Sequence, residues 1–387
     1  MALESLFWSM LALVVYSYCL YPLIVLTIVK LGRPGGPPIE QAGDLPAVSV
    51  VISVFNEENV LEAKLKNLAS LDYPKDKIEF LFGSDGSNDR TNDILSLGSK
   101  SIITLKVFTE RRGKATVLND LLSIAKGDII VFSDANTIYA RDTIRQLTKH
   151  FQLPEVGAVC GELVLEHDGN SVGSFGESSY WKYENFLKNI ESRCRTILGA
   201  TGGIYAIRKS LYRPLPTTKA ITDDFLIPLN VLSQGSCVKY EPNALAYEKT
   251  SDSIRGEFRR KVRIGASNFQ GLSEFSSLLH PRNGFVSFAL WSHKIIRWCI
   301  PFLLIVEFCA NIYLSGTSSF YRMILIGQLV FLGLCLIGFL SEKMKLQIGI
   351  LGYPYYLLAM NAALFVGFWK FALGRQRPTW EVLRGKG

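Results

Sequence analysis

Four long stretches with almost no charged residues constrain this chain more than any other feature of its sequence. At about 1.5 Å per residue, a helix of about 20 apolar residues crosses the ~30 Å hydrocarbon layer of a bilayer. The sequence therefore predicts membrane-spanning helices. Within a membrane, Glu307 would be either a partnered polar group in a helix bundle or part of a pathway. The stretches are Ser5–Val29, Trp298–Tyr321, interrupted only by Glu307, Met323–Ser341 and Leu346–Trp369.

A longer polar segment separates the first stretch from the others, so we expect a membrane part joined to a soluble domain. Of the 387 residues, 48% are hydrophobic, a value between those of soluble enzymes and transporters. The first stretch lacks a basic start and precedes Lys30 and Arg33, which is typical of an uncleaved anchor. The seven cysteines include no C-x-x-C pair, so neither a disulfide framework nor a zinc site is indicated.

Within the polar segment, strand patterns alternate with helix patterns. Four short apolar runs are typical of strands buried on both faces, and the pattern of residues 117–125, closed by Gly127, is typical of a helix. This alternation predicts an α/β fold with a mainly parallel sheet. The predicted strands are Val48–Val54, Ile78–Ser84, Ile103–Phe108 and Asp128–Asp134. The predicted organisation is an N-terminal transmembrane helix (1–31), a Gly/Pro-rich linker (32–44), a soluble domain (45–275), an interfacial amphipathic helix (280–298), C-terminal transmembrane helices (299–373) and a basic tail (374–387).

Polar residues follow all four predicted strands, and parallel sheets bind ligands at this edge. These residues are Asn56 and Glu57 after the first strand, Asp85 after the second, Lys114 after the third and Asp134 after the fourth. Asp85 can accept from a base N–H, Glu57 from a ribose hydroxyl, and Lys114 can reach a phosphate. Asp85 could instead only cap the following helix. The loop before Lys114 lacks the spacing of a P-loop, which argues against an ATPase.

Six short motifs, in the same order along the chain, resemble the family-2 glycosyltransferases with the GT-A fold, in their membrane-integrated branch. This resemblance implies an inverting transfer from a nucleotide sugar. The motifs are "VISVFNEEN", "GSDGSNDRT" (D-G-S-x-D-x-T), "RRGKATVLN" (G-K-A-x-x-L-N), "SDANT" (D-x-D), "ATGGIYAIR" (a glycine segment on the acceptor side) and "TDDF" (T-E-D).

The D-x-D position implies a Mg²⁺ or Mn²⁺ site at Asp134. A divalent cation at a diphosphate takes one or two protein carboxylates and fills its other positions with phosphate oxygens and water. Asn136 stands where the family has a second Asp and offers only a neutral carbonyl oxygen, so we expect weaker binding of free metal. The alternative is that Asp134 merely ends a strand in an Asx turn.

The remaining motifs imply residues on the acceptor side. Asp224 occupies the last acid of T-E-D and is the expected catalytic base, while Asp223 is expected to orient the loop or the acceptor. Both could instead only cap a helix beginning near Phe225. Gly202 lies in the glycine segment. In "RRKVRI", which falls at the Q-x-x-R-W motif of processive members, Arg263 matches the arginine that meets the diphosphate, whereas Arg260 replaces Gln.

The Trp of Q-x-x-R-W is replaced by Ile264, which favours a single addition over polymer synthesis. We therefore expect a hexosyltransferase of the cell membrane with a cytosolic catalytic domain. Its donor is expected to be a UDP-sugar, and its acceptor a lipid or lipid-linked saccharide in polysaccharide or glycolipid biosynthesis. A processive synthase is the nearest alternative, and a non-catalytic nucleotide-sugar-binding protein is another. Nucleic-acid binding is not expected, because the basic residues cluster beside apolar spans.

The helix pattern of residues 284–298 places aromatic and aliphatic residues on one face and His293, Lys294 and Arg297 on the other. We expect this helix to lie on an anionic leaflet, and the alternative is an ordinary surface helix of the soluble domain. By the positive-inside rule the domain faces the cytosol and the N-terminus lies outside. The basic residues that follow Trp369 favour a cytosolic tail, so one apolar segment is not expected to cross, and "LGYPYYLLAMNAALF" is the candidate.

Overall fold

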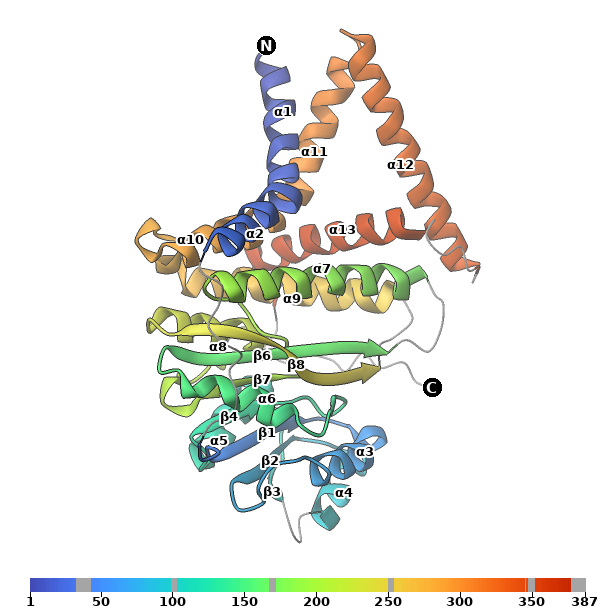
Figure 1. The fold of residues 1–387 in the computed structure, drawn as a ribbon. Helices are drawn as coiled ribbons and strands as arrows, with labels where there is room; N and C mark the ends of the chain where they lie inside the picture. The colour runs from blue at the N-terminus through green and yellow to red at the C-terminus, as the bar shows by residue number, and fades with distance from the viewer. Residues whose placement is uncertain are drawn as a thin grey trace.

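The computed structural model describes residues 1–32, 43–98, 103–166, 172–249, 254–344, 346 and 352–376. Most of the predicted linker (32–44) and of the basic tail (374–387) lies outside these residues. A sheet domain and a set of long apolar helices occupy opposite ends of the molecule (Figure 1).

In the part of the chain that the structure describes, one mixed sheet of eight strands forms the centre of the domain, in the order β3-β2-β1-β4-β7-β6-β8-β5. The first four strands in this order are parallel, as predicted, whereas β7 runs antiparallel to both β4 and β6. The predicted parallel pairing is complete in the N-terminal half, whereas the other half is mixed, since β6 and β8 pair in parallel and β5 and β8 antiparallel. The strands are β1 (Val48–Val54), β2 (Ile78–Asp85), β3 (Ile103–Phe108), β4 (Ile129–Phe132), β5 (Ile138–Tyr139), β6 (Val156–Glu166), β7 (Tyr205–Arg208) and β8 (Cys237–Lys249).

Helices cover both faces of the sheet, because alternate residues of each strand point to opposite sides. In β1, Val50 and Ile52 belong to one apolar cluster and Val51 to the other. The helices of the chain are α1 (Ala2–Val15), α2 (Tyr21–Leu31), α3 (Glu58–Ala69), α4 (Thr91–Gly98), α5 (Lys114–Ile124), α6 (Thr143–Thr148), α7 (Val172–Cys194), α8 (Asp223–Ser233), α9 (Ile254–Glu274), α10 (Phe285–Ala289), α11 (Ile296–Leu314), α12 (Ser319–Lys343) and α13 (Tyr353–Ala372), with short 3₁₀ turns at Lys149–Gln152, Lys209–Leu211, Ser276–Leu279 and Pro281–Asn283.

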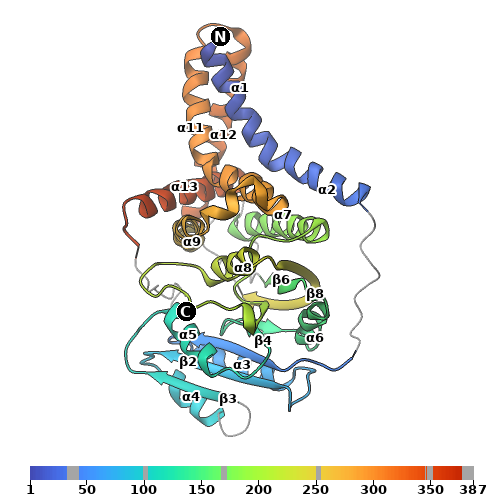
Figure 2. The same cartoon turned by 90° about the vertical axis from the view of Figure 1, so that its left-hand side faces the viewer.

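Among the described residues, four helical segments are long and apolar enough to cross a membrane: Ala2–Leu31, Phe285–Leu314, Ser319–Lys343 and Tyr353–Ala372. The first two each contain one π-helical turn, at Tyr16–Leu20 and Leu290–Ile295. Such turns bend helices, and α2 and α10 turn away from the direction of α1 and α11 (Figures 1 and 2). The predicted boundary near residue 298 is therefore not a helix end.

The two bends touch each other. The hydroxyl groups of Tyr16 and Ser292 lie 2.7 Å apart, and Ser17 donates to the carbonyl of Ser292 at 3.1 Å. Tyr21 and Val25 of α2 and Trp298 of α11 also belong to the apolar cluster that covers one face of the sheet. The apolar helices and the sheet domain thus share one core.

The basic face of the segment that includes α10 points into the protein. His293 and Arg297 are only 3% and 8% exposed. Arg297 Nη1 donates to Glu184 Oε1 at 2.6 Å, and His293 Nδ1 lies 2.7 Å from Glu191 Oε1. Our prediction that this face meets an anionic leaflet is wrong, because two glutamates of α7 supply the negative charge instead.

Helix α13 crosses the direction of α1, α11 and α12 and runs along α9 (Figure 1). Phe269 of α9 packs against Phe368 and Phe371, with ring centroids 5.3 and 5.9 Å apart. Gly367 allows this close approach, since a Cβ atom there would lie 2.9 Å from the carbonyl oxygen of Val262. Part of the predicted stretch Leu346–Trp369, namely residues 347–351, lies outside the described chain.

Glu307 is a partnered polar group between apolar helices, the first of the two alternatives. Gln328 of α12 donates from its amide to both Glu307 carboxylate oxygens at 2.9 Å. Asn311 donates to the Gln328 carbonyl at 2.8 Å. These bonds join α11 to α12.

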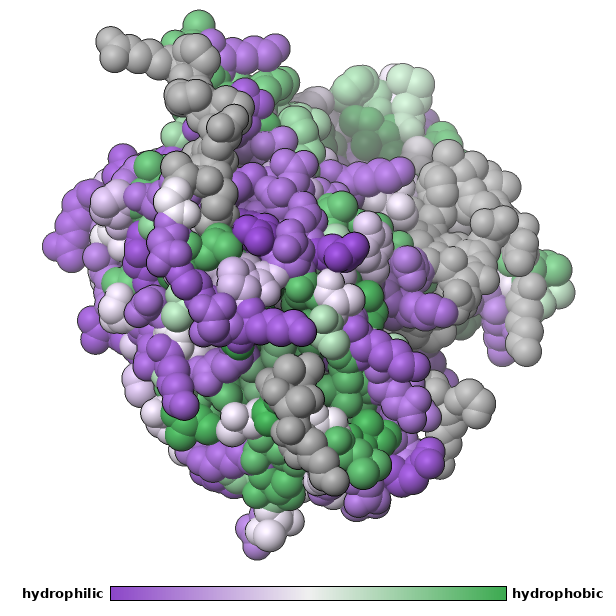
Figure 3. All heavy atoms as spheres, turned by 60° about the horizontal axis from the view of Figure 1, so that its bottom comes forward, coloured by the Kyte–Doolittle hydropathy of each residue, from purple (hydrophilic) through white to green (hydrophobic). Residues whose placement is uncertain are grey.

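The surfaces of the two ends differ. The face of the sheet domain that points away from the apolar helices is mostly hydrophilic (Figure 3). Large exposed hydrophobic side chains are instead frequent on α11 and α12, for example Ile305, Met323 and Leu336. This contrast is typical of a protein with one end in water and the other in lipid.

We expect the packing of α13 on α9 to depend on Gly367. The Gly367→Leu substitution should lower the free energy of unfolding by about 1–3 kcal/mol, because the new side chain meets backbone atoms that cannot move aside. The midpoint of thermal unfolding in detergent measures this effect. Gly327→Leu in α12 is the control, since nothing lies within 4 Å of a Cβ atom there. Equal midpoints for the two variants would contradict the packing.

Candidate active site

A lysine bridges two carboxylates at the carboxyl edge of the parallel strands. Lys114 Nζ lies 2.9 Å from Asp134 Oδ1 and 3.1 Å from Asp223 Oδ1. The three side chains come from the start of α5, the end of β4 and the start of α8. Three of the predicted site residues, far apart in sequence, are therefore in direct contact.

The loop before Lys114 is fixed by Asp85. Its two carboxylate oxygens accept from the backbone N–H groups of Arg112 and Gly113 at 2.7 and 2.9 Å. Gly113 has φ of 90°, a conformation that favours glycine, and α5 begins at the next residue. The alternative that Asp85 only caps the helix after its own strand is therefore wrong. Instead Asp85 presents Lys114 to the site.

The ion pairs set the charge states of Lys114 and Asp134. Burial alone would lower the pKa of Lys114, but Asp134 and Asp223 hold that pKa above its usual range. Burial would likewise raise the pKa of Asp134, yet Lys114 holds it below its usual range. Both groups are charged at neutral pH, and the side chain of Asp134 remains 36% exposed.

Asp223 and Asp224 open helix α8, two residues earlier than predicted. Thr222 is the N-cap residue, and the N-terminus of a helix favours negative charge. Tyr205, which is fully buried, donates to Asp223 Oδ2 at 2.8 Å. Burial, and then the charge of Asp223, raises the pKa of Asp224 to about 6. Asp223 is thus anchored, while Asp224 binds protons more readily than an ordinary aspartate.

Gly202 leaves open the space between two carboxylates. A Cβ atom at this position would lie 3.2 Å from Asp224 Oδ2 and 3.7 Å from Asp134 Oδ2. In the described part of the chain, no group of three or more His, Cys, Asp or Glu residues could hold a metal ion. Asp134 nevertheless fits a Mg²⁺ or Mn²⁺ ion that takes its other ligands from a diphosphate, because such ions need few protein carboxylates.

A small pocket continues from Lys114 towards the ends of β1 and β2. Glu57, which is 6% exposed, lines it together with Asp85 and Arg111. The guanidinium of Arg111 lies over the ring of Phe55, 3.9 Å from the ring centroid. The predicted base and ribose residues therefore share one pocket next to the carboxylates.

Asn56 lies beside this pocket and shapes the turn after β1. It has φ of 54°, which asparagine tolerates better than most residues. Its side-chain oxygen accepts from the backbone N–H of Asn88 at 3.0 Å, and its own N–H donates to Ser87 Oγ at 3.2 Å. These bonds tie the end of β1 to the loop that follows β2.

Two predicted site residues are engaged elsewhere, and a third lies close to the carboxylates. The side chain of Asn136 hydrogen-bonds Glu248 of β8. Arg260 Nη1 lies 3.4 Å from a carboxylate oxygen of Glu257 in its own helix. Burial, and then the charge of Arg260, lowers the pKa of Arg263. Asp224, Asp134 and Asp223 lie close enough to Arg263 that their charges act in the opposite direction.

Sequence reasoning missed Tyr205 and Lys64. Tyr205 gave no signal beyond an aromatic residue in a strand, although it holds Asp223. Lys64 is 0% exposed and lies on the buried face of α3 with Leu61 and Leu68. A lysine within an apolar helix stripe was the signal that could have found it.

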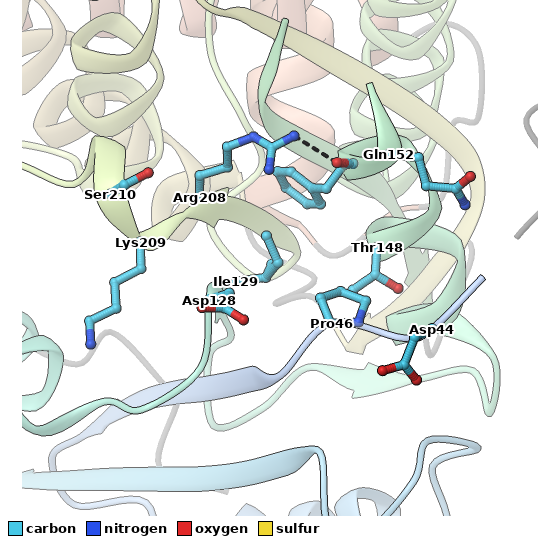
Figure 4. A pocket seen from close by; sticks show the side chains of 10 residues that line it. Asp44, Pro46, Asp128, Ile129, Thr148, Gln152, Arg208, Lys209 and Ser210 are labelled. Carbon is cyan, nitrogen blue, oxygen red and sulfur yellow. Dashed lines mark hydrogen bonds between the residues drawn. The ribbon is translucent and has the colours of Figure 1, made fainter. Parts of the chain in front are cut away.

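A second cavity lies at the opposite edge of the sheet. It holds about 790 Å³ and is lined by residues near the starts of β1 and β4 and the end of β7, among them Pro46, Asp128 and Arg208 (Figure 4). Arg208 already donates to the carbonyls of Val156 and Phe151 at 2.8 and 2.6 Å. Because parallel sheets bind ligands at their carboxyl edge, we place the functional site at Lys114 instead.

Comparison with solved structures identifies the fold. A mannosyltransferase, PcManGT from Pyrobaculum calidifontis, solved in complex with GDP-Man and Mn²⁺, superposes with a TM-score of 0.74 at 21% sequence identity, over 97% of this chain and 100% of that one. The domain has the GT-A fold of nucleotide-diphospho-sugar transferases, as predicted.

Residues 49–215 match the family described as Glycosyl transferase family 2. The chain is 26% identical over 238 residues to "Probable glycosyltransferase YdaM" of Bacillus subtilis (strain 168), which covers 59% of this chain and 57% of that protein. It is 24% identical over 224 residues to poly-beta-1,6-N-acetyl-D-glucosamine synthase of Staphylococcus aureus (strain MSSA476), covering 57% and 54% respectively. The chain thus spans about half the length of these curated relatives, and the part of it that matches the family 2 model is residues 49–215.

Proposed function

We propose that this protein transfers a sugar from a nucleotide sugar to an acceptor hydroxyl at a membrane, with inversion at the anomeric carbon. The observation that carries the proposal is the bridge from Lys114 to Asp134 and Asp223, beside Asp224. Diphosphate-binding groups and a proton acceptor then lie within one site, as a displacement at the anomeric carbon requires.

In this proposal the donor lies along the carboxyl edge of the sheet. Its base and ribose enter the pocket of Glu57 and Asp85, and its diphosphate meets Lys114 and Arg263. When bound, Mg²⁺ or Mn²⁺ would neutralise charge on the leaving diphosphate, held by Asp134 with Asn136 as the second candidate ligand. A UDP-sugar is the donor we expect. A GDP-sugar is the alternative, since the mannosyltransferase with the same fold was solved with GDP-Man.

Asp224 acts as the catalytic base in this scheme. The acceptor oxygen forms a bond to the anomeric carbon and gives its proton to Asp224, while the bond to the diphosphate breaks and its electron pair leaves with the diphosphate. Asp223 has a different role, because Lys114 and Tyr205 hold its carboxylate. It orients the start of α8.

We propose a lipid or lipid-linked saccharide as the acceptor, because α9, which carries Arg263, packs directly beneath α13. A single addition remains our proposal on account of Ile264. Processive synthesis is the second candidate, favoured by the similarity to the Staphylococcus aureus synthase. The length of the product made by purified protein separates the two.

We also propose three membrane crossings, with the sheet domain and the tail in the cytosol. Helix α13 supports this topology, since it lies along α9 instead of beside α11 and α12. Alkaline phosphatase fused after Gly387 should therefore be inactive, and green fluorescent protein fused there should fluoresce. Phosphatase inserted at Gly316, between α11 and α12, is the control and should be active. Active phosphatase at Gly387 would overturn the cytosolic tail.

Donor binding should depend on Asp134 and a divalent cation. Asp134→Ala should weaken Mn²⁺-dependent binding of the donor at least about 100-fold, because the charge of the diphosphate is then uncompensated. Asn136→Asp should be tolerated. Titration calorimetry with UDP- and GDP-sugars measures both, and Asp44→Ala, at the opposite edge of the sheet, is the control. Full activity in excess chelator would rule out the metal.

Turnover should depend on an ionised Asp224. Turnover is measured as the release of nucleoside diphosphate from a panel of UDP- and GDP-sugars. For the wild type, kcat/KM should fall about tenfold between pH 7 and pH 5, because the Asp224 carboxylate, with a pKa of about 6, becomes protonated over this range. Asp224→Asn should lose on the order of 10²- to 10⁴-fold while keeping donor binding. Thr222, not Asp224, is the N-cap residue of α8, so the substitution leaves the cap in place, and near-normal turnover of folded Asp224→Asn would disprove the base.

A further inference from the structure

Lys64 is fully buried beneath the loop that carries Asp134. Its ammonium donates to Ser133 Oγ at 2.7 Å and to the carbonyl oxygen of Thr137 at 2.5 Å. It also lies over the ring of Tyr139, 4.6 Å from the centroid. One side chain of α3 thus reaches both ends of the segment Ser133–Thr137.

This arrangement is costly to maintain. Both acceptors are neutral oxygens, which compensate an ammonium for its lost hydration less well than a carboxylate in direct contact would. Burial accordingly lowers the pKa of Lys64 to about 7. A methionine would fill the same space on the apolar face of α3 without this cost, so packing alone does not account for a lysine here.

The segment that Lys64 holds is otherwise a short turn. The N–H of Thr137 donates to the carbonyl of Asp134 at 3.3 Å, which closes it. Immediately beyond the turn, Asn67 of α3 pairs through its amide with both backbone groups of Tyr139, at 2.7 and 2.8 Å. Lys64 and Asn67 lie three residues apart, on one face of α3. The helix therefore fixes the path of the chain from Ser133 to Tyr139.

We propose that Lys64 is a positioning residue that holds the Ser133–Thr137 turn so that the carboxylate of Asp134 is presented to the divalent cation. This inference rests on the proposed function, because the cation belongs to the proposed donor complex. Two N–H donors are sufficient for the role, so it requires no particular charge on Lys64. Groups that orient metal ligands typically contribute about 10- to 100-fold to metal affinity.

The test measures the affinity of the protein for Mn²⁺ in the presence of UDP and, in a parallel experiment, of GDP. The electron paramagnetic resonance signal of free Mn²⁺ gives this affinity. Lys64→Met should weaken binding about 10- to 100-fold, and Ser133→Ala, which removes one acceptor, should weaken it less. Lys209→Met is the matched control, since Lys209 also donates to a backbone carbonyl, that of Ala125, but at the opposite edge of the sheet. Thermal unfolding without metal is recorded for every variant.

A purely structural lysine would lower the unfolding midpoint and leave the Mn²⁺ affinity unchanged. If the Lys64→Met variant is folded and its affinity for Mn²⁺ is within about twofold of that of the wild type, the proposal is overturned. If Lys64→Met does not fold, Ser133→Ala decides by the same criterion. Wild-type protein that binds no Mn²⁺ with either nucleotide would overturn the proposed function as well, so the two failures are distinguishable.

Discussion

The site depends on one ammonium group. Lys114 bridges Asp134, at the end of a parallel strand, and Asp223, at the start of a helix about 90 residues later. Without a cation between them, two such carboxylates would repel each other and one would take up a proton. Asp85 fixes the loop that delivers Lys114, and Tyr205 fixes Asp223. The bridge therefore joins the parallel half of the sheet, which suits a nucleotide, to the segment that carries the predicted base.

The position of this site relative to the apolar helices follows from a second set of buried charges. Glu184 and Glu191 of α7 pair with Arg297 and His293, and Tyr21 of α2 donates to Glu191 at 2.5 Å. Burying these groups is costly unless all are partnered, so the helices are held in one orientation on the domain. A rigid junction of this kind places Asp224 at a fixed depth below the helices, which suits an acceptor that stays in the membrane.

The sequence predicted the first half of the fold well because buried parallel strands leave uninterrupted apolar runs, and β1 and β3 have the bounds that we expected. Lys114 and Asp134 were predicted at strand ends and Asp223 from the resemblance to the T-E-D motif, and the structure brings the three side chains into contact. The burial of His293 and Arg297 was not predictable, because helical periodicity separates faces without saying which one meets lipid. The roles of Lys64 and Tyr205 and the bond from Asn136 to Glu248 depend on tertiary contacts that no local pattern records.

The most direct test of the central claim is an experimental structure with Mn²⁺ and the nucleoside diphosphate that binds. Our account predicts Mn²⁺ coordinated by a carboxylate oxygen of Asp134 and by the diphosphate. It also predicts that Lys114 has left Asp134 for a phosphate oxygen while Asp223 keeps its bond from Tyr205. Nucleotide and Mn²⁺ bound away from this edge of the sheet, with the bridge of Lys114 to Asp134 and Asp223 intact, would contradict the account.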